Sequence, residues 1–232
     1  MPRLPRIITI DGEAHTGKSL AALKLATALD LYLLNTGAMY RSVAHLLGEV
    51  GVNVLDEKNR EAERIRELIE PWEFALHGQD VHVNGRPMPP TIFDEPMNAL
   101  ASAVSKWGEV RRKLQAEQRR IAGPHPHVVC EGRDQGTVVF PHAEVKFYFV
   151  AHYDVQAERA ARKKRELTPH EPIDLAALRR SVELRDRADK SRPIDPLRKA
   201  DDAVEIDTSA LTPDEVLARL LKEVAAWQSP TT

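Results

Sequence analysis

The chain has 232 residues, of which 42% are hydrophobic, and a formal net charge of −2 at pH 7. This length predicts one domain over residues 1–232 with small inserted lobes at most, and the hydrophobic fraction is sufficient for a buried core. The balanced charge gives no electrostatic footprint for nucleic acid, and no apolar run is long enough to cross a membrane. The one cysteine, Cys130, excludes an internal disulfide, so we expect a cytoplasmic protein with neither nucleic-acid nor membrane partners.

The first predicted elements are a strand, a glycine-rich turn and a helix. The segment Ile7–Asp11 is short, apolar and β-branched like a buried parallel strand, and the apolar residues from Leu20 to Leu29 keep helical spacing. The residues between them match the pattern G-x-x-x-x-G-K-[ST] of phosphate-binding loops: Gly12-Glu13-Ala14-His15-Thr16-Gly17-Lys18-Ser19. Because the flanking strand and helix are the context that the pattern requires, phosphate binding is favoured over a chance glycine turn.

The chemistry of this loop follows from its parts. Gly12 and Gly17 let successive backbone N–H groups point at an anion, and the positive N-terminal end of the next helix attracts negative charge. Lys18 supplies a mobile cation for the outer phosphates of a nucleotide, and the Ser19 hydroxyl can ligate a Mg²⁺ ion that bridges two of them. Glu13 is unexpected, because a carboxylate beside a triphosphate weakens binding unless it points away.

A second buried strand is predicted at Leu31–Leu34, followed by helical composition over residues 38–50. Thr36, Tyr40 and Arg41 lie at or near the carboxyl end of this strand, where open α/β sheets bind ligands. Arg41 could be a solvated helix charge, but its place near the phosphate loop favours binding of an anion.

The middle of the chain changes its periodicity. Residues 56–69 predict a charged, exposed helix, after which alternating hydrophobic residues between Trp72 and Val83 predict short strands. Asn84-Gly85 is typical of a tight hairpin turn. These features predict a small antiparallel lobe and not a further parallel strand–helix unit.

Two helices should follow this lobe, over residues 95–104 and 109–122. The first carries Ser102. The second carries Arg111 within a basic run whose members, taken singly, we expect to be mostly solvated.

Two more core strands are predicted at residues 127–130 and 145–150, and a short last strand at 203–207. Arg133 and Asp134 follow the first of them, again at the carboxyl end of a strand. Two ligand-binding segments are therefore expected at one edge of the sheet.

The C-terminal third is rich in basic residues. A helix over residues 155–167 carries Arg159 and Arg162, and Asp174 can cap the next helix. In that helix three polar residues would share one face if it continues far enough: Arg185, Asp189 and Arg192.

Together these segments resemble the bacterial cytidylate kinases, the nucleoside monophosphate kinases that act on CMP and dCMP. The resemblance covers nearly the whole chain and rests on ITIDG with GKS, on NTGAMYR at Asn35–Arg41 and on Ser102 nine residues before Arg111. Its most specific parts are EGRDQGTVVFPHA at residues 131–143 and RDRADKSRPIDPL at residues 185–197, with ERAARK at residues 158–163 between them.

This resemblance implies an α/β fold, a three-layer P-loop kinase core with a parallel sheet. A monophosphate-binding lobe would be inserted at about residues 36–122, and a short lid at about residues 159–175. It implies transfer of the γ-phosphoryl group of ATP to CMP or dCMP in pyrimidine nucleotide metabolism, with Mg²⁺ ligated by Ser19. The protein would act as a monomer.

The resemblance also implies a role for each site residue. The phosphates of the substrate would be bound by Arg41, Arg133 and Arg192. The cytosine would be recognised by Ser102, Arg111 and Asp134. The sugar would contact Arg185 and Asp189, in a pocket lined by Thr36 and Tyr40. Catalysis would depend on Lys18, Arg133, Arg162 and Arg192. ATP would be bound by residues 12–20, from Gly12 to Leu20, and by Arg159.

Departures from the family pattern leave two alternatives open. Glu13 stands where proline or a small residue is usual, Asn35 replaces an aspartate, and Leu20 replaces a threonine, so that Ser19 carries the hydroxyl role alone. One alternative is a non-catalytic nucleotide-binding module. The other is a different P-loop kinase, acting on shikimate or adenylate, against which the inserted lobe and Asp134 argue.

Overall fold

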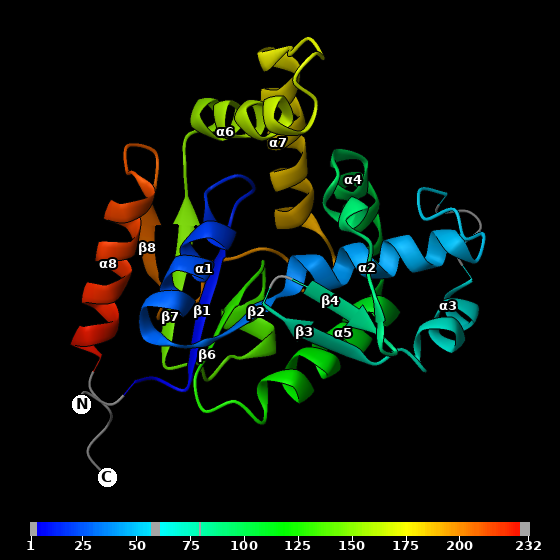
Figure 1. Cartoon of the computed structure of the whole chain (residues 1–232), viewed down its shortest axis with the longest axis horizontal. Helices are drawn as coiled ribbons and strands as arrows, with labels where there is room; N and C mark the ends of the chain where they lie inside the picture. Colours follow the sequence, from blue (N-terminus) through cyan, green and yellow to red (C-terminus); the bar gives the residue numbers. More distant parts are fainter. Residues whose placement is uncertain (1–3, 57–60, 79, 228–232) are drawn as a thin grey trace. The chain divides into compact units, whose positions relative to one another are not determined.

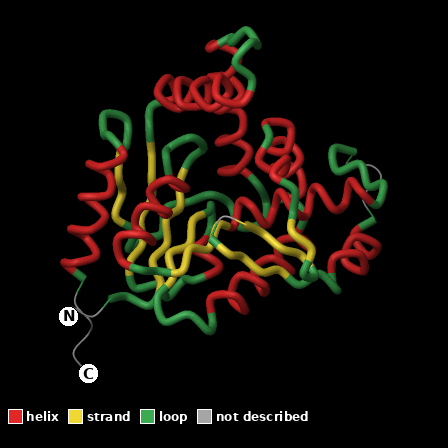
Figure 2. The backbone as a smooth tube through the Cα atoms, viewed as in Figure 1, coloured by secondary structure: helices red, strands yellow, loops and turns green. Residues whose placement is uncertain are grey.

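Two β-sheets organise the chain, one of five strands and one of three (Figures 1 and 2). The structure, a computed structural model, describes residues 4–56, 61–78 and 80–227. It divides into two compact units, Met1–Leu33 with His125–Thr232, and Leu34–Pro124. None of the helices within the described ranges combines the length and the apolar character that a membrane crossing requires.

The five-stranded sheet has the order β2-β6-β1-β7-β8. Its strands are β1 (Ile7–Gly12), β2 (Tyr32–Asn35), β6 (Val128–Glu131), β7 (Val145–Val150) and β8 (Val204–Asp207). β1 pairs in parallel with β6 and β7, and β7 with β8. Because Ile10 lies opposite Glu131, the carboxyl ends of β1 and β6 reach the same edge of the sheet. The polar segments that follow these two strands therefore start side by side.

Helices lie on both sides of this sheet, which gives the predicted three-layer α/β fold (Figure 1). On one face, α1 (Lys18–Leu29) and α8 (Pro213–Ala226) pack through Leu25 and Leu220 against Phe147 and Phe149. Fully burying a side chain of this size contributes about 1.5–3 kcal/mol, so this layer fixes α1, and with it the loop before α1, to the sheet.

A helical hairpin extends from the same unit. It consists of α6 (Tyr153–Leu167) and α7 (Leu175–Ser191), and Ala160 of the first helix lies in one apolar cluster with Val182 of the second. Asp174 caps α7 as expected, because its side chain accepts a hydrogen bond from the N–H of Ala177.

The second unit combines helices with the small antiparallel sheet. In chain order its elements are α2 (Thr36–Glu49), α3 (Ala62–Ile69), β3 (Phe74–His77), β4 (Asp80–Val83), β5 (Arg86–Pro87), the 3₁₀ turn η2 (Pro90–Phe93), α4 (Glu95–Val104) and α5 (Gly108–Ala122). Asn84 and Gly85 form the predicted turn between β4 and β5, with φ values of 50° and 75°. Such positive values at both central residues are typical of the tight hairpin turn that an Asn-Gly pair favours.

The helix expected over residues 56–69 is shorter than predicted. α3 begins at Ala62, and Glu61 before it has an extended backbone with φ −89° and ψ 99°; residues 57–60 lie outside the described ranges. Its two buried side chains are Ile65 and Ile69, one turn apart. Because a helix in a protein is stabilised mainly by the face that it buries, these two side chains hold α3 in place.

Candidate active site

The loop after β1 has a backbone that its glycines make possible. Gly12 has φ 142°, and a Cβ atom on it would lie 2.2 Å from the carbonyl oxygen of Phe149. Gly17, the N-cap of α1, has φ 93°, and His15 between them has φ 52°. Position 12 therefore requires glycine because β7 lies too close for a Cβ atom. Position 17 requires glycine because of its dihedral angle alone.

Two carbonyl groups of the loop are bound by residues outside it. The hydroxyl of Thr208 donates to the carbonyl oxygen of Thr16 at 3.0 Å, and Arg159 Nη1 donates to that of His15 at 3.5 Å. The first turn of α1 contains no acidic residue, and Gly17 provides no side-chain cap. The N–H groups at the start of the helix thus keep their capacity for an anion, which fits the phosphates of a nucleotide.

Lys18 lies inside this loop and is only 5% exposed. Its Nζ donates to the carbonyl oxygen of Glu13 and lies 3.3 Å from the hydroxyl oxygen of Thr16. Burial, and then the charge of Arg133, lowers the pKa of Lys18 to about 7. An anion placed in the loop would reverse this shift, because an opposite charge favours the ammonium form.

ATP binding should therefore take up a proton through Lys18. Below pH 7 the side chain is already charged and affinity should change little; above pH 7 affinity should fall by up to about tenfold per pH unit, because binding must first protonate the amine. At pH 8 we expect an uptake of about one proton per ATP, measured by titration calorimetry in buffers of different ionisation enthalpy. Lys18→Met is the control and should remove most of the uptake; an equal uptake in this variant would assign the proton to another group.

Asp11, the residue before the loop, positions the segment that follows β6. Its two carboxylate oxygens accept the N–H groups of Gln135 at 2.9 Å and of Gly136 at 2.7 Å. Burial raises the pKa of Asp11 to about 7, although both of these hydrogen bonds act against the shift. By these contacts Asp11 holds the segment that carries Arg133 and the buried Asp134 beside the phosphate loop.

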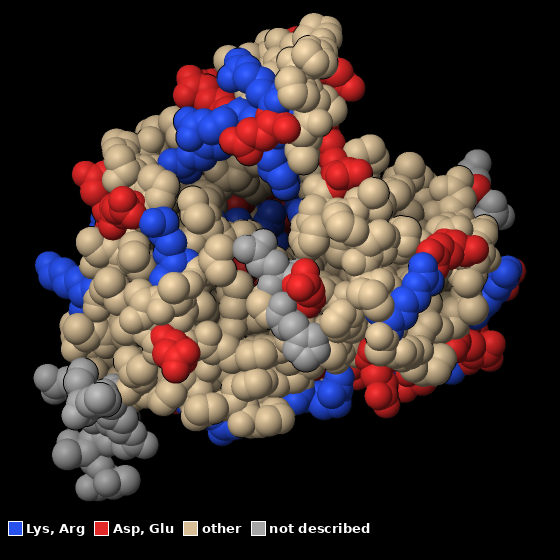
Figure 3. All heavy atoms as spheres, in the orientation of Figure 1, with Lys and Arg blue, Asp and Glu red and all other residues tan. Residues whose placement is uncertain are grey.

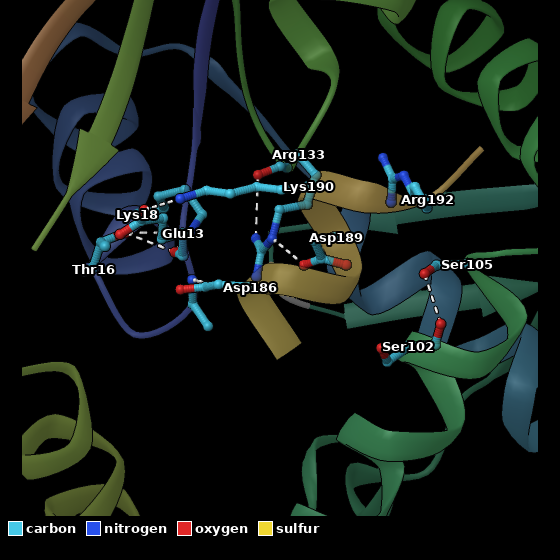
Figure 4. A network of polar contacts seen from close by, with 12 residues as sticks. Glu13, Thr16, Lys18, Ser102, Ser105, Arg133, Asp186, Asp189, Lys190 and Arg192 are labelled. Carbon is cyan, nitrogen blue, oxygen red and sulfur yellow. Dashed lines mark hydrogen bonds and ion pairs between the residues drawn. The ribbon is translucent and has the colours of Figure 1, made fainter. Parts of the chain in front are cut away.

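Arg133 joins this segment to α7. Its Nε donates to Asp189 Oδ2 at 2.9 Å (Figure 4). Burial raises the pKa of Asp189. The charges of Arg133, Arg185 and Arg192 outweigh burial and hold this pKa below its usual range. The structure therefore brings three predicted cations to one carboxylate of α7. α7 persists to Ser191 and Arg192 is its C-cap, so the expected polar face is formed up to the end of the helix.

In the second unit, Arg41 and Thr36 lie on α2. Thr36 is buried at the start of the helix. Arg41 Nη2 donates to the side-chain oxygen of Asn98 at 2.9 Å, and the Arg41 guanidinium carbon lies 5.9 Å from the centre of the Phe93 ring. Packing against α4 and η2 thus limits the directions that this guanidinium can take.

Arg111 overturns the expectation that each arginine of its basic run is solvated. It is 1% exposed, its Nη1 donates to the carbonyl oxygen of Ser105 at 3.0 Å, and its guanidinium carbon lies 5.8 Å from the centre of the Tyr40 ring. The hydroxyl of Ser105 in turn donates to the carbonyl oxygen of Ser102 at 2.8 Å (Figure 4). Three predicted residues, Tyr40, Ser102 and Arg111, therefore belong to one cluster within this unit.

The two predicted arginines of α6 have different surroundings. Arg159 Nη2 donates to the carbonyl oxygen of Thr208 at 2.6 Å and so braces the loop from outside. Arg162 is exposed. Figure 3 shows Lys and Arg side chains gathered over α6. Burial and then the charge of Arg162 lower the pKa of Arg159.

Ser19 and Leu20, in the first turn of α1, are exposed, with Leu20 at 46%.

Sequence reasoning missed four residues of this site. Three of them contact the loop residues Glu13 or Ala14, and the fourth contacts Thr16: Gln156, Asp186, Lys190 and Thr208. Asp186 and Lys190 are four residues apart on α7, a spacing that places two side chains on one helical face. No local signal marks Thr208, whose role follows from the packing of the chain after β8.

A parallel sheet with this loop after its first strand, a buried loop lysine and arginines converging from several segments defines a P-loop kinase. The shikimate kinase of Bacteroides thetaiotaomicron has the same fold, with a TM-score of 0.51 and 11% identity over 94% of this chain and 97% of that one.

The chain belongs to the cytidylate kinase family, because residues 8–226 match the family described as Cytidylate kinase. It is 39% identical to the cytidylate kinase of Rhodococcus jostii, over 94% of each chain. It is also 39% identical to the cytidylate kinase of Geobacillus kaustophilus, over 94% of this chain and 95% of that one. The bifunctional pantoate ligase/cytidylate kinase of Prochlorococcus marinus is 38% identical over 95% of this chain, which spans only 43% of that protein.

Proposed function

We propose that this protein transfers the γ-phosphoryl group of ATP to CMP or dCMP and so supplies CDP or dCDP in pyrimidine nucleotide metabolism. The observation that carries this proposal is the family match over residues 8–226, together with a phosphate loop whose Lys18 lies near Arg133. We place the reaction in the cytoplasm, with which the single cysteine is compatible, and we assign it to a monomer.

The residues of the site would act by position and charge. The acceptor of the phosphoryl group is an ionised phosphate, so no general base is required, but two anions must be held together against their repulsion. Lys18, Arg133 and Arg192 would neutralise the moving phosphoryl group, and Arg162 would join them when the lid at about residues 159–175 closes. Closure would also exclude water, which could otherwise accept the phosphoryl group.

Mg²⁺ fits the site through ATP rather than through a protein cage. The Ser19 hydroxyl is exposed in the first turn of α1, and within the described ranges no group of three or more His, Cys, Asp or Glu side chains could hold a metal ion. Mg²⁺ is commonly bound by few protein ligands together with phosphates and water. Bound in this way, it would neutralise phosphate charge, and Ser19 would orient it.

The monophosphate would be bound by the residues that the family resemblance assigns to it. Arg41 and Arg192 would hold its phosphate, while Arg185 and Asp189 would contact the sugar. Thr36 and Tyr40 would line the pocket, which the packing of Arg111 beside Tyr40 supports.

Base recognition would need an acceptor and donors, because cytosine presents an amino group beside a ring nitrogen and a carbonyl oxygen. We assign the acceptor to Asp134 and the donors to Ser102 and Arg111. Uracil presents a carbonyl oxygen in place of the amino group, so it would face the Asp134 carboxylate with no proton between them. An unpaired buried polar group costs about 1–3 kcal/mol, which corresponds to roughly 5- to 160-fold in kcat/KM.

The decisive assay measures turnover with ATP and a panel of CMP, dCMP, UMP, AMP and shikimate. We expect the two cytidine nucleotides to be preferred over UMP by about 5- to 160-fold. Asp134→Asn should narrow that ratio, since an amide can turn a donor towards the uracil carbonyl. Equal proportional losses for CMP and UMP would show that Asp134 only braces Arg133, and ATP binding without any turnover would favour the non-catalytic module.

A further inference from the structure

The Glu13 side chain points out of the phosphate loop and into the α6–α7 hairpin. One carboxylate oxygen, Oε1, lies 2.6 Å from Lys190 Nζ (Figure 4). The other, Oε2, accepts from Gln156 Nε2 at 2.9 Å. The residue is only 8% exposed. Its charge is therefore paired within the protein, and the electrostatic repulsion of ATP expected from the sequence has no geometric basis.

The two partners of Glu13 stand at the base of the hairpin. Gln156 lies in the first turn of α6, where its Nε2 also donates to the carbonyl oxygen of Ala151 at 2.8 Å. Lys190 lies in the last turn of α7. One carboxylate thus contacts the helix by which the chain enters the hairpin and the helix by which it leaves.

The next loop residue makes two further contacts with the same helices. The N–H of Ala14 donates to Asp186 Oδ1 at 2.8 Å, and its methyl group packs in a cluster with Ala160 and Val182. Asp186 lies one turn before Lys190, so α7 meets the loop along one face.

Other residues of the same helices meet the site that binds phosphates. Asp189 of α7 pairs with Arg133, and Arg159 of α6 braces the loop carbonyl of His15. A change in how the loop docks on the hairpin would therefore move the anion-binding N–H groups and these arginines relative to each other. Positioning errors of about 1 Å can cost about 100-fold in rate.

We propose that Glu13 is a positioning residue that fastens the phosphate loop to both helices at the base of the α6–α7 hairpin and so keeps the loop in register with the arginines around it. This inference deepens the proposed kinase function and rests on it. It assigns to Glu13 a favourable effect on ATP binding, whereas simple charge repulsion would give the opposite sign.

The pair with Lys190 has the electrostatics that this role requires. Burial lowers the pKa of Lys190, but the hydrogen bond and the charge of Glu13 outweigh it and hold the pKa above its usual value. The Lys190 side chain is thus charged at neutral pH when the loop is docked.

A double-mutant cycle tests the proposal. Glu13→Gln removes the charge but keeps an acceptor for Gln156, and Lys190→Met removes the partner charge. ATP dissociation constants and kcat are measured for both variants and for the double variant. Each single variant should bind ATP about 3- to 10-fold more weakly than wild type and have a lower kcat. The double variant should bind ATP no more weakly than the single variant with the lower affinity, because the two changes break one interaction.

The matched control is Arg187→Met on the same helix. Arg187 pairs with Glu183 at 2.7 Å and is exposed, and among the described residues it makes no hydrogen bond or ion pair with the loop. ATP affinity should therefore stay within about twofold of wild type.

Three results would overturn the proposal. Tighter ATP binding by Glu13→Gln would mean repulsion, additive losses in the double variant would mean that the two residues act separately, and a lower melting temperature with unchanged ATP affinity and kcat would mean a merely structural contact. Absence of CMP turnover in the wild type would contradict the proposed kinase function. In that case the ATP dissociation constants of the double-mutant cycle would still test the role of Glu13.

Discussion

Lys18→Ala is expected to lower kcat for CMP by about 10³-fold while leaving the protein folded. The loss should be large because the ammonium group would stabilise charge that develops on the transferred phosphoryl group, where water cannot replace it. It should appear in kcat and also as weaker ATP binding, since the ammonium group would contact the phosphates in the bound substrate and more strongly in the transition state.

Stability should not suffer from the same change. The pKa of Lys18 is lowered from 10.5 to about 7, so the folded protein disfavours the charged side chain relative to the unfolded chain. Between these two values the unfolded wild type binds more protons, so its stability should rise with pH from about 7 to 10. The alanine variant lacks this pH dependence and should be at least as stable as the wild type at pH 7. Thermal melts of both proteins at pH 7 and pH 10 can measure this.

Lys24→Ala is the matched control for this experiment. Lys24 lies on the same helix and pairs at 2.7 Å with Asp214, which is largely exposed. Its removal should change kcat by less than about twofold, since exposed ion pairs contribute about 0–1 kcal/mol. Near-normal turnover in a folded Lys18→Ala protein would remove Lys18 from the mechanism.

Gly12→Ala should abolish ATP binding and lower the free energy of unfolding by about 2–5 kcal/mol. The added Cβ would lie 2.2 Å from the carbonyl oxygen, 2.7 Å from the nitrogen and 2.9 Å from the carbonyl carbon of Phe149. All three are backbone atoms of β7, so no side chain can move aside, and the hydrogen bond from the Glu13 N–H to the Phe149 carbonyl oxygen at 3.2 Å must also be disturbed. The phosphate loop starts at this point and would lose its shape.

Two further glycines give a graded comparison by chemical denaturation. Gly17→Ala meets no atom within 4 Å, so only the φ of 93° opposes it and the cost should be about 1–2 kcal/mol. Gly123→Ala, at a right-handed helical position after α5, should change stability by less than about 1 kcal/mol. Equal destabilisation at positions 12 and 17 would show that dihedral strain, and not contact with β7, determines the need for Gly12.

The sequence by itself was sufficient for the phosphate loop, the parallel strands and the family. These depend on short-range patterns, namely a glycine spacing between a β-branched run and a helical run, and strands buried on both faces. The Asn84-Gly85 turn was also predictable, because backbone preferences act within a few residues.

The tertiary structure alone decided where the charges go. Glu13 meets Lys190 across 177 residues of sequence, and Gln156 across 143. Taken singly, Arg111 was expected to be a solvated charge of its basic run, yet it is buried beside Tyr40 of another helix. Local spacing places a side chain on a face of its own element, but its partner is set by the packing of elements far apart in the chain, which determines whether a charge meets water, an opposite charge or an aromatic ring.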